Sequence, residues 1–250
     1  MNDMLRRIVH RVHALVVKGG RDVPPLAVEK AEECFYINYL QPGMTVFDVG
    51  ANVGELSLLF SRFVGTSGKV HAFEALEETF ERLRTVITST GRSNLILNNI
   101  GVADVTGARG INVYDRNHSG WTTFAVRPLL KYGIDMKPVR QEMIKTVSID
   151  DYCHELEIPR IDLLKIDVEG AEYQVLRGAE KMLREKRVAV CVFEFGQTTF
   201  DMGNDPAEIA RFMKQCGYSL ENIVNGQPVF PGGEQVETAH FSMHICRPLV

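Results

Sequence analysis

Short apolar runs alternate along this chain with segments in which apolar residues recur every three or four positions. Continuous runs of about four to eight apolar residues are typical of buried strands, and the longer spacing is typical of the helices that cover them. The runs lie at residues 45–49, 69–73, 94–100, 162–168, 188–195, 218–224 and 240–246. The helical segments lie at residues 55–63, 77–90, 171–183 and 205–216. This alternation predicts an α/β fold, a doubly wound sheet of about seven strands with helices on both faces.

Residues 1–40 precede the first strand and carry two further helical patterns. The first, at residues 4–17, has apolar residues on one side and its arginines mostly on the other. Such an amphipathic helix packs on the edge of its own domain, acts as a lid, forms a homodimer contact or lies on a membrane surface, and the pattern leaves these alternatives open. The second, at residues 27–39, leads into the first strand and is placed to roof a pocket. We therefore expect an N-terminal helical cap at residues 1–40 and one main domain at residues 41–250.

Residues 110–148 interrupt the alternation. They predict a strand at 110–114, a polar loop at 115–122 and a second strand at 142–148. A doubly wound domain needs only a helix between its third and fourth strands, so this segment is predicted to be an insertion. Insertions beside the open edge of such a sheet commonly form the substrate pocket.

The loop of this insertion holds the only tryptophan of the chain. Trp121 closely follows His118, and Asp115 begins the loop. An indole beside an imidazole suits a sugar-like or ring-bearing substrate, which makes Asp115 and Trp121 candidate substrate-binding residues. A hydrophobic clamp inside the insertion accounts for Trp121 equally well.

The first strand ends in a glycine-containing turn that leads into a helix. Gly50, Asn52 and Gly54 predict a tight turn whose backbone a ligand can approach, at a helix start with free N–H groups. Asp48 lies at the strand tip, where its carboxylate would repel the pyrophosphate of a dinucleotide and attract the amino group of S-adenosylmethionine. The third glycine of the dinucleotide fingerprint is also missing. The turn therefore favours S-adenosylmethionine as the ligand.

Two further acids follow strand ends. Glu74 ends the second strand, at about the 20-residue distance at which a βαβ unit places an acid over ribose hydroxyls. Asp104 follows the third strand, where such folds hold adenine, and it is a candidate for that contact. The alternatives are a solvated strand end for Glu74 and a turn residue for Asp104.

The fourth and fifth strands also end in acids. Asp167 lies at the tip of the fourth strand, and Glu194 lies near the end of the fifth. Together with Asp48 and Glu74, these acids converge on one edge of a parallel sheet, which indicates an enzyme. Lys165 is expected to be half-buried and to form a structural ion pair with an acid.

Three stretches of sequence resemble a known family. They are Val-Phe-Asp-Val-Gly-Ala-Asn-Val-Gly at 46–54, His-Ala-Phe-Glu-Ala at 71–75 and Lys-Ile-Asp-Val-Glu-Gly-Ala-Glu at 165–172. They are similar to the FkbM family of S-adenosylmethionine-dependent methyltransferases, over roughly residues 45–195. The resemblance implies a Rossmann-like class I methyltransferase sheet and O-methylation of a sugar or a secondary metabolite. Ala75 departs from the family, which often has proline at that place.

Charge and cysteine usage narrow the choice of partners. The net charge of −4 supplies no excess cationic surface, which disfavours a nucleic-acid partner. The five cysteines lie far apart and form no C-x-x-C pair, which disfavours a disulfide framework and a structural zinc site. No apolar run approaches the ~18 residues of a transmembrane helix. We expect a cytoplasmic protein whose partner is a small-molecule acceptor.

Methyl transfer to a hydroxyl requires the chain to align the acceptor and to remove or share its proton. Two arrangements of the candidate residues remain open. In one, Asp167, Glu169 and Glu194 hold a divalent cation such as Mg²⁺, which lowers the pKa of the hydroxyl. In the other, which we favour, no metal takes part, an acid such as Asp167 or Glu194 orients the hydroxyl, and His118 takes its proton.

Other functions remain as alternatives. A protein that binds S-adenosylmethionine without catalysis would share the same motifs. An NAD-dependent oxidoreductase of the Rossmann type is disfavoured by Asp48 and by the missing glycine, and a final antiparallel edge strand at 240–246 fits methyltransferases better. The acceptor, including the choice between a hydroxyl and an amine, stays open.

Overall fold

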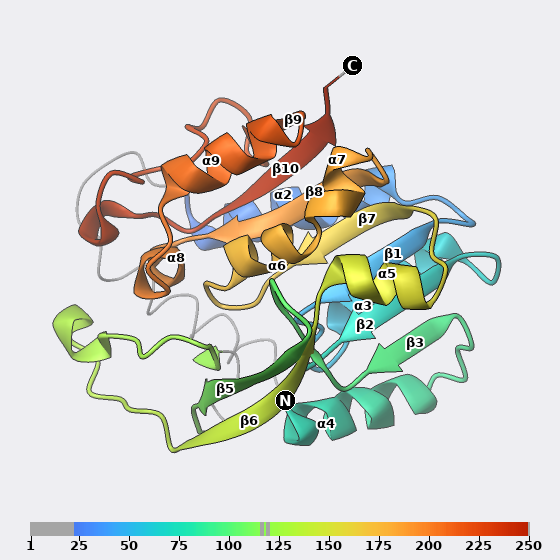
Figure 1. The fold of residues 1–250 in the computed structure, drawn as a ribbon, viewed down its shortest axis with the longest axis horizontal. Helices are drawn as coiled ribbons and strands as arrows, with labels where there is room; N and C mark the ends of the chain where they lie inside the picture. Colours follow the sequence, from blue (N-terminus) through green and yellow to red (C-terminus); the bar gives the residue numbers. More distant parts are fainter. Residues whose placement is uncertain (1–22, 116–117, 119–120, 250) are drawn as a thin grey trace.

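A seven-stranded sheet forms the centre of the molecule (Figure 1). The computed structural model describes residues 23–115, 118 and 121–249, so the predicted helix at 4–17 lies outside the described residues. The strands are β1 (Thr45–Val49), β2 (Lys69–Phe73), β3 (Leu95–Asn98), β7 (Ile161–Ile166), β8 (Val188–Phe195), β9 (Tyr218–Asn222) and β10 (Ser242–Pro248). Their order is β3-β2-β1-β7-β8-β10-β9. This order reverses between β1 and β7, where a doubly wound sheet opens a ligand crevice at the carboxyl ends of its strands.

The register of β1 with its neighbours sets the face on which the site lies. Both β2 and β7 run parallel to β1, and Asp48 lies opposite Ala72 on β2 and opposite Lys165 on β7. Side chains of paired residues point to the same face of a sheet. Asp48 and Lys165 are therefore neighbours on one face.

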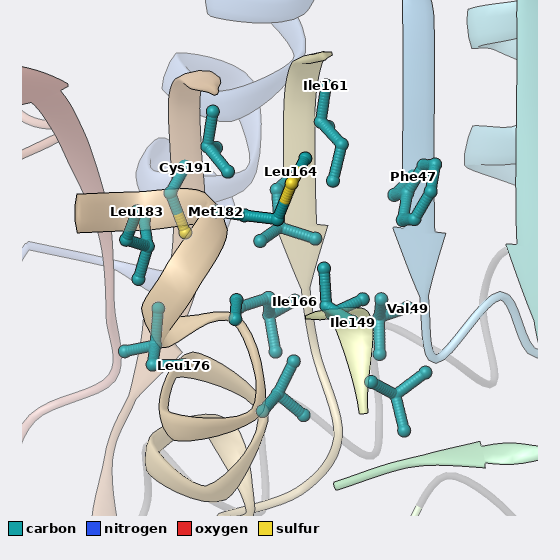
Figure 2. Close-up of a cluster of buried hydrophobic side chains, with 14 of the residues drawn as sticks. Phe47, Val49, Ile149, Ile161, Leu164, Ile166, Leu176, Met182, Leu183 and Cys191 are labelled. Carbon is teal, nitrogen blue, oxygen red and sulfur yellow. The ribbon is translucent and has the colours of Figure 1, made fainter. Parts of the chain in front are cut away.

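Helices cover both faces of the sheet. They are α2 (Pro25–Tyr39), α3 (Glu55–Val64), α4 (Glu77–Thr88), α5 (Ile149–Glu155), α6 (Glu172–Gly178), α7 (Glu180–Arg184), α8 (Gln197–Asp201) and α9 (Pro206–Gln215). α2 and α3 pack on one face, over a core that includes Tyr36 and Phe60. α5, α6, α7 and α9 pack on the other, over a core that includes Phe47 and Leu164 (Figure 1, Figure 2). None of the helices in the described ranges has the length and apolar character needed to cross a membrane.

The predicted α/β doubly wound sheet is confirmed, and the differences lie in its later elements. β10 is antiparallel as expected, but it lies between β8 and β9, so the expectation of a final strand at the edge is wrong. The helix predicted at 171–183 is two helices, because Ala179 leaves the helical conformation (φ −109°, ψ 12°) and ends α6. Neither α5 nor α8 was predicted. Ser148 caps α5 by accepting a hydrogen bond from the Asp151 backbone N–H.

A second, smaller sheet occupies the predicted insertion. Its strands are β4 (Gly101–Val102), β5 (Gly107–Val113) and β6 (Arg140–Val147), in the order β4-β6-β5. The sheet begins before residue 110, the predicted boundary, because β4 and the start of β5 precede it. One short 3₁₀ helix, η2 (Leu129–Tyr132), lies between β5 and β6, and another, η3 (Val236–Thr238), precedes β10.

Trp121 lies inside this insertion. Its side chain is only 3% exposed, and it packs in a small cluster with Tyr114 and Leu129. The ring of His118 lies 5.1 Å from the indole, centroid to centroid. Of the two interpretations left open by the sequence, this burial favours the hydrophobic clamp.

We expect Trp121→Ala to lower the free energy of unfolding by about 3–5 kcal/mol, because it leaves a cavity in the core of the insertion. Urea unfolding followed by far-UV circular dichroism measures the loss. Leu130→Ala is the control, since Leu130 lies in the same insertion and is 74% exposed. Its effect should stay within about 0.5 kcal/mol. Equal effects of the two variants would contradict the buried placement of Trp121.

Candidate active site

The turn between β1 and α3 brings the backbones of β1 and β7 into contact. Gly50 (φ 82°) and Gly54 (φ 88°) lie in the left-handed region, with Asn52 (φ 49°) between them. A Cβ atom on Gly50 would lie 1.8 Å from the backbone oxygen of Asp167, and a Cβ atom on Gly54 would lie 2.5 Å from the Leu83 side chain. Both positions therefore require glycine. The turn leads to the start of α3, where backbone N–H groups lack partners within the helix.

Lys165 is the buried cation of the site. Its Nζ atom lies 3.4 Å from Asp48 Oδ1 and 3.3 Å from Asp167 Oδ2. Burial alone would lower the pKa of Lys165, but the carboxylates of Asp167 and Asp48 outweigh burial and raise it. The lysine is only 2% exposed, so it lies deeper than the predicted half-buried position. It does have the expected acid partners.

The two carboxylates differ in their access to solvent. Asp48 is fully buried, and the Ser57 hydroxyl donates a hydrogen bond to its Oδ2 atom at 2.5 Å. The side chain of Asp167 is 40% exposed. The predicted contact between Asp48 and the amino group of the ligand, direct or through water, stays a prediction. Asp167 is the accessible acid of the ion group.

Glu74 is joined to the same turn. Its carboxylate accepts hydrogen bonds from the backbone N–H groups of Asn52 at 3.1 Å and of Leu76 at 3.0 Å. Burial raises the pKa of Glu74 to about 7, against the effect of these hydrogen bonds. The acid at the tip of the second strand therefore lies beside the glycine-containing turn.

Three more carboxyl groups surround Asp167. They are Glu169, Glu172 and Glu194. Glu172 accepts hydrogen bonds from the backbone N–H groups of Val168 at 3.0 Å and of Gly170 at 3.1 Å, and so shapes the turn that follows β7. Burial, the nearby carboxyl groups and a hydrogen bond with Asp167 all raise the pKa of Glu194. This edge of the sheet has an excess of acid, which favours a cationic ligand.

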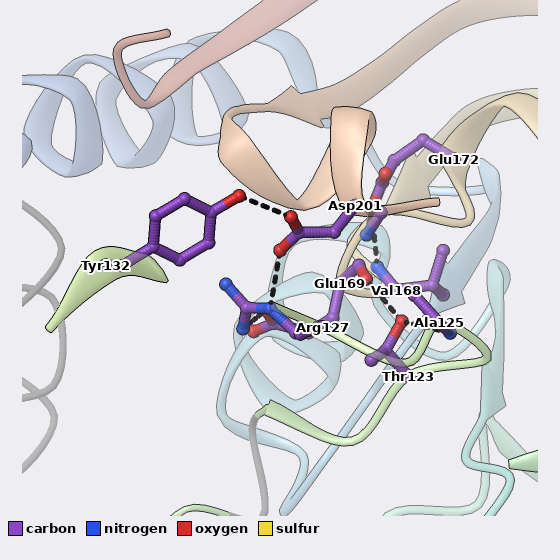
Figure 3. Close-up of polar contacts among 9 residues, drawn as sticks. Thr123, Ala125, Arg127, Tyr132, Val168, Glu169, Glu172 and Asp201 are labelled. Atoms are coloured by element: carbon purple, nitrogen blue, oxygen red, sulfur yellow. Dashed lines mark hydrogen bonds and ion pairs between the residues drawn. The ribbon is translucent and has the colours of Figure 1, made fainter. Parts of the chain in front are cut away.

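A buried arginine fixes the insertion to this edge (Figure 3). Arg127 Nε donates a hydrogen bond to Asp201 of α8 at 3.0 Å, and its Nη1 lies 4.0 Å from the Glu169 carboxylate. The Tyr132 hydroxyl donates to the same Asp201 at 2.6 Å. The Thr123 hydroxyl donates to the backbone oxygen of Glu169 at 2.7 Å. The insertion is thus bonded to the turn after β7 and to α8.

Glu32 of α2 also faces this edge, and it was not predicted as a site residue. The Tyr36 hydroxyl donates a hydrogen bond to Glu32 Oε1 at 2.6 Å. The Glu32 carboxyl also interacts electrostatically with Lys165 and Asp167. A signal was present in the sequence: Val28, Glu32 and Tyr36 are four residues apart, so the acid lies on the apolar stripe of a helix.

The remaining predicted site residues lie in or beside the insertion. His118 Nδ1 lies 2.9 Å from Asp115 Oδ1, and the His118 ring packs beside Trp121. Asp104, which follows β4, lies 3.5 Å from the guanidinium of Arg109 on β5. The described contacts of His118 are therefore with the insertion itself, whereas the acids of β1, β7 and β8 come together at the sheet edge.

The described ranges hold no group of three or more His, Cys, Asp or Glu side chains placed to bind a metal ion. Asp167, Glu169 and Glu194, the alternative magnesium ligands of the sequence analysis, do not form such a set. Asp167 is instead paired with Lys165 and hydrogen-bonded to Glu194.

The sequence of this chain is similar to those of known methyltransferases. A family model described as the methyltransferase FkbM domain matches residues 48–220. The hexuronic acid methyltransferase AglP of Haloferax volcanii is 26% identical over 206 residues, which cover 82% of this chain and 72% of the relative. The 31-O-demethyl-FK506 methyltransferase FkbM of Streptomyces tacrolimicus is 30% identical over 215 residues, which cover 78% of this chain and 79% of the relative.

Solved structures share the fold. An rRNA methylase from Streptococcus thermophilus has a TM-score of 0.51 and 13% identity, covering 89% of this chain and 97% of its own. SMU.1697c from Streptococcus mutans, solved in complex with SAH, has a TM-score of 0.51 and 11% identity, covering 89% of this chain and 98% of its own. At these identities the likeness establishes the fold alone.

We expect Lys165→Met to lower the free energy of unfolding by about 3–5 kcal/mol, because it leaves the buried Asp48 carboxylate without a cation. Urea unfolding at pH 7 measures the loss. Adding Asp48→Asn should restore part of it, since the uncompensated charge is then gone.

The control for this variant is Lys214→Met, which removes an exposed lysine of α9. Its effect should stay within about 0.5 kcal/mol. The buried ion group would be of little importance if Lys165→Met were equally mild, or if Asp48→Asn made the double variant still less stable.

Proposed function

Because this chain belongs to the FkbM family of methyltransferases, which depend on S-adenosylmethionine, we propose that it methylates a hydroxyl group of a sugar or of another hydroxylated natural product. The two curated relatives carry the proposal. One is named for a hexuronic acid and the other for an O-demethyl compound, so both names point to oxygen-bearing acceptors. Family membership also sets aside the oxidoreductase alternative.

The turn after β1 fits the adenosine part of S-adenosylmethionine. Gly50 and Gly54 leave the backbone open to a ligand at the point where the strand order reverses. Glu74, held beside this turn through Asn52, is the proposed acceptor of hydrogen bonds from the ribose hydroxyls. Asp104, after β4, is proposed to lie on the adenine side.

The acids at the tips of β7 and β8 fit the positively charged part of S-adenosylmethionine. S-adenosylmethionine supplies an activated methyl group on a positively charged sulfur, next to a cationic amino group. An edge with excess carboxyl groups attracts such a ligand. We assign Asp167 to this role because its carboxylate is accessible. Asp48 serves by holding Lys165, and with it Asp167, in position.

Asp167 and Glu194 are also proposed to orient the acceptor hydroxyl. They share a hydrogen bond, and burial is the largest of the causes that raise the pKa of Glu194. The side chain of Asp167 is 40% exposed, which suits a contact with the bound ligands. For His118 to take the proton, as the sequence suggested, its ring would have to leave Asp115 and reach the sheet edge.

Binding and transfer assays test this function separately. Calorimetry with S-adenosylhomocysteine should detect binding. Tritium should then move from labelled S-adenosylmethionine to at least one member of an acceptor panel of neutral methyl glycosides, methyl uronides and a hydroxylated macrolactone. Binding without labelling of any hydroxylated acceptor would favour a binding protein without catalysis, and labelling of amines alone would overturn the O-methylation.

We expect Glu74→Ala to weaken S-adenosylhomocysteine binding about 10- to 100-fold, because a charge-assisted hydrogen bond to the ribose is worth roughly 1.5–3 kcal/mol. Calorimetry on the folded variant measures the change. Glu81→Ala, which removes a partly exposed acid of α4, is the control and should bind as the wild type does. Unchanged affinity in Glu74→Ala would remove the ribose assignment.

A further inference from the structure

A hollow lies between the start of α2, the loop that joins β9 to β10, and the start of β10, and its volume is about 310 Å³ when the part open to solvent is included. Val28, Val224 and Phe241 form apolar walls, and Gln227, His240 and Ser242 add polar groups. None of the described residues that line it is an acid, a lysine or an arginine. Such a lining suits an uncharged ring with hydroxyl groups, which packs its apolar face on the walls and bonds to the amide and imidazole.

This hollow adjoins the acidic edge of the main sheet. Met243 of β10 pairs with Glu194 of β8, and Phe241 lies just before β10, packed in the same core cluster as Met243 and Val28. Gly196 immediately follows β8, and a Cβ atom on Gly196 would lie 3.9 Å from the Cα atom of Phe241. The hollow is therefore next to the tip of β8.

α2 connects the hollow to the ion group. Val28 lines the hollow, and Glu32 lies one helical turn further along, about 6 Å along the axis and on the same side of the helix. Glu32 is half-buried, and its carboxyl is hydrogen-bonded by the fully buried Tyr36. It lies outside residues 48–220, which the family model matches. Neither the family match nor the sequence motifs assign it a role.

We propose that the acceptor places an uncharged, hydroxylated ring in this hollow and presents its hydroxyl to Glu32, whose carboxylate accepts the proton during methyl transfer. The inference rests on the proposed function and names its acceptor site. In the reaction, the acceptor oxygen forms a bond to the methyl carbon and the carbon–sulfur bond breaks, leaving its electron pair on sulfur. The hydroxyl proton moves to a Glu32 oxygen and then to water.

The charges around Glu32 suit this role. Burial raises the pKa of Glu32 to about 7, while Lys165 and the Tyr36 hydrogen bond oppose the rise and Asp167 and Asp48 add to it. A proton acceptor works best when its pKa is near the working pH. Since the carboxylate form is the active one, kcat should rise with pH through about 7 and then level off.

The same acids should determine which charge on the acceptor allows binding. Asp167, and Glu32 in its carboxylate form, would repel a carboxylate on the ring, and no lysine or arginine lines the described part of the hollow. A neutral methyl hexoside should therefore have a kcat/KM at least about tenfold above that of the matching methyl hexuronide at pH 7. Preference for the hexuronide would overturn the assignment of an uncharged ring.

The decisive variant is Glu32→Gln, assayed with the best acceptor of the panel. We expect kcat to fall at least about 100-fold, as for loss of a general base, with the KM for S-adenosylmethionine within about twofold of the wild type. Glu33→Gln is the matched control, since it removes the same charge from an exposed position of the same helix. It should behave as the wild type does.

Tyr36→Phe separates a chemical role of Glu32 from a structural one. Loss of the hydrogen bond from Tyr36 should raise the pKa of Glu32, and the rise of kcat with pH should move to higher pH. In Glu32→Gln the rise near pH 7 should be absent. A purely structural Glu32 would leave the pH profile in place in Tyr36→Phe. Glu32→Asp, which keeps a carboxylate, should retain part of the activity and serves if Glu32→Gln does not fold.

A pair of glutamines on the β9–β10 loop tests the hollow. Gln227→Ala should raise the acceptor KM about tenfold while the Kd for S-adenosylhomocysteine stays unchanged. Gln235→Ala, at an exposed position of the same loop, should change neither. Equal KM values in the two variants would remove the hollow from the acceptor site.

The outcomes separate this inference from the proposed function. No methyl transfer to any acceptor of the panel would overturn the proposed function and this inference with it. Transfer that survives in Glu32→Gln with an unchanged kcat and pH profile would overturn this inference alone.

Discussion

The buried contact of Lys165 with the carboxylates of Asp48 and Asp167 is the constraint on which the rest of the site depends. β1 and β7 meet where the strand order reverses, so closely that Gly50 has no room for a Cβ atom beside the Asp167 backbone. Two carboxylates at such neighbouring tips would repel each other in a buried place, and the ammonium between them removes that cost. One ion group thereby keeps Asp48 buried beside the glycine-containing turn and leaves Asp167 as the accessible acid.

The carboxyl groups around this ion group are not all balanced by cations. Burial raises the pKa values of Glu32, Glu74 and Glu194, so several carboxyl groups of the free protein are held where their charge is not fully compensated. A cationic ligand that binds at this edge would supply the missing positive charge. Methyl transfer turns a positively charged sulfur into a neutral one. The attraction of an acid-rich edge for this ligand would therefore weaken as the product forms, which would assist product release.

The sequence predicted those parts of the site that depend on local pattern. The first strand, its turn and the acid that ends the second strand are each marked within a few residues, and the parallel topology places their tips together. The position of β10 between β8 and β9, the break at Ala179 and the burial of Trp121 depend on contacts between distant segments. Glu32 was missed for the same reason. An acid on an apolar helical stripe was visible, but only the packing of α2 on the sheet shows that it faces Lys165.

The residues that the family model matches include the proposed cofactor-binding residues but not the proposed acceptor site. Residues 48–220 contain the glycine-containing turn, Glu74 and the tips of β7 and β8, which together form the proposed cofactor half. α2 precedes this range, and the loop before β10 follows it, yet the two meet at the hollow. All described residues that line the hollow lie outside residues 48–220, whereas the buried ion group lies within them. The two curated relatives are named for different acceptors, so we expect acceptor contacts to vary in the segments outside the family match while the proposed cofactor half stays the same.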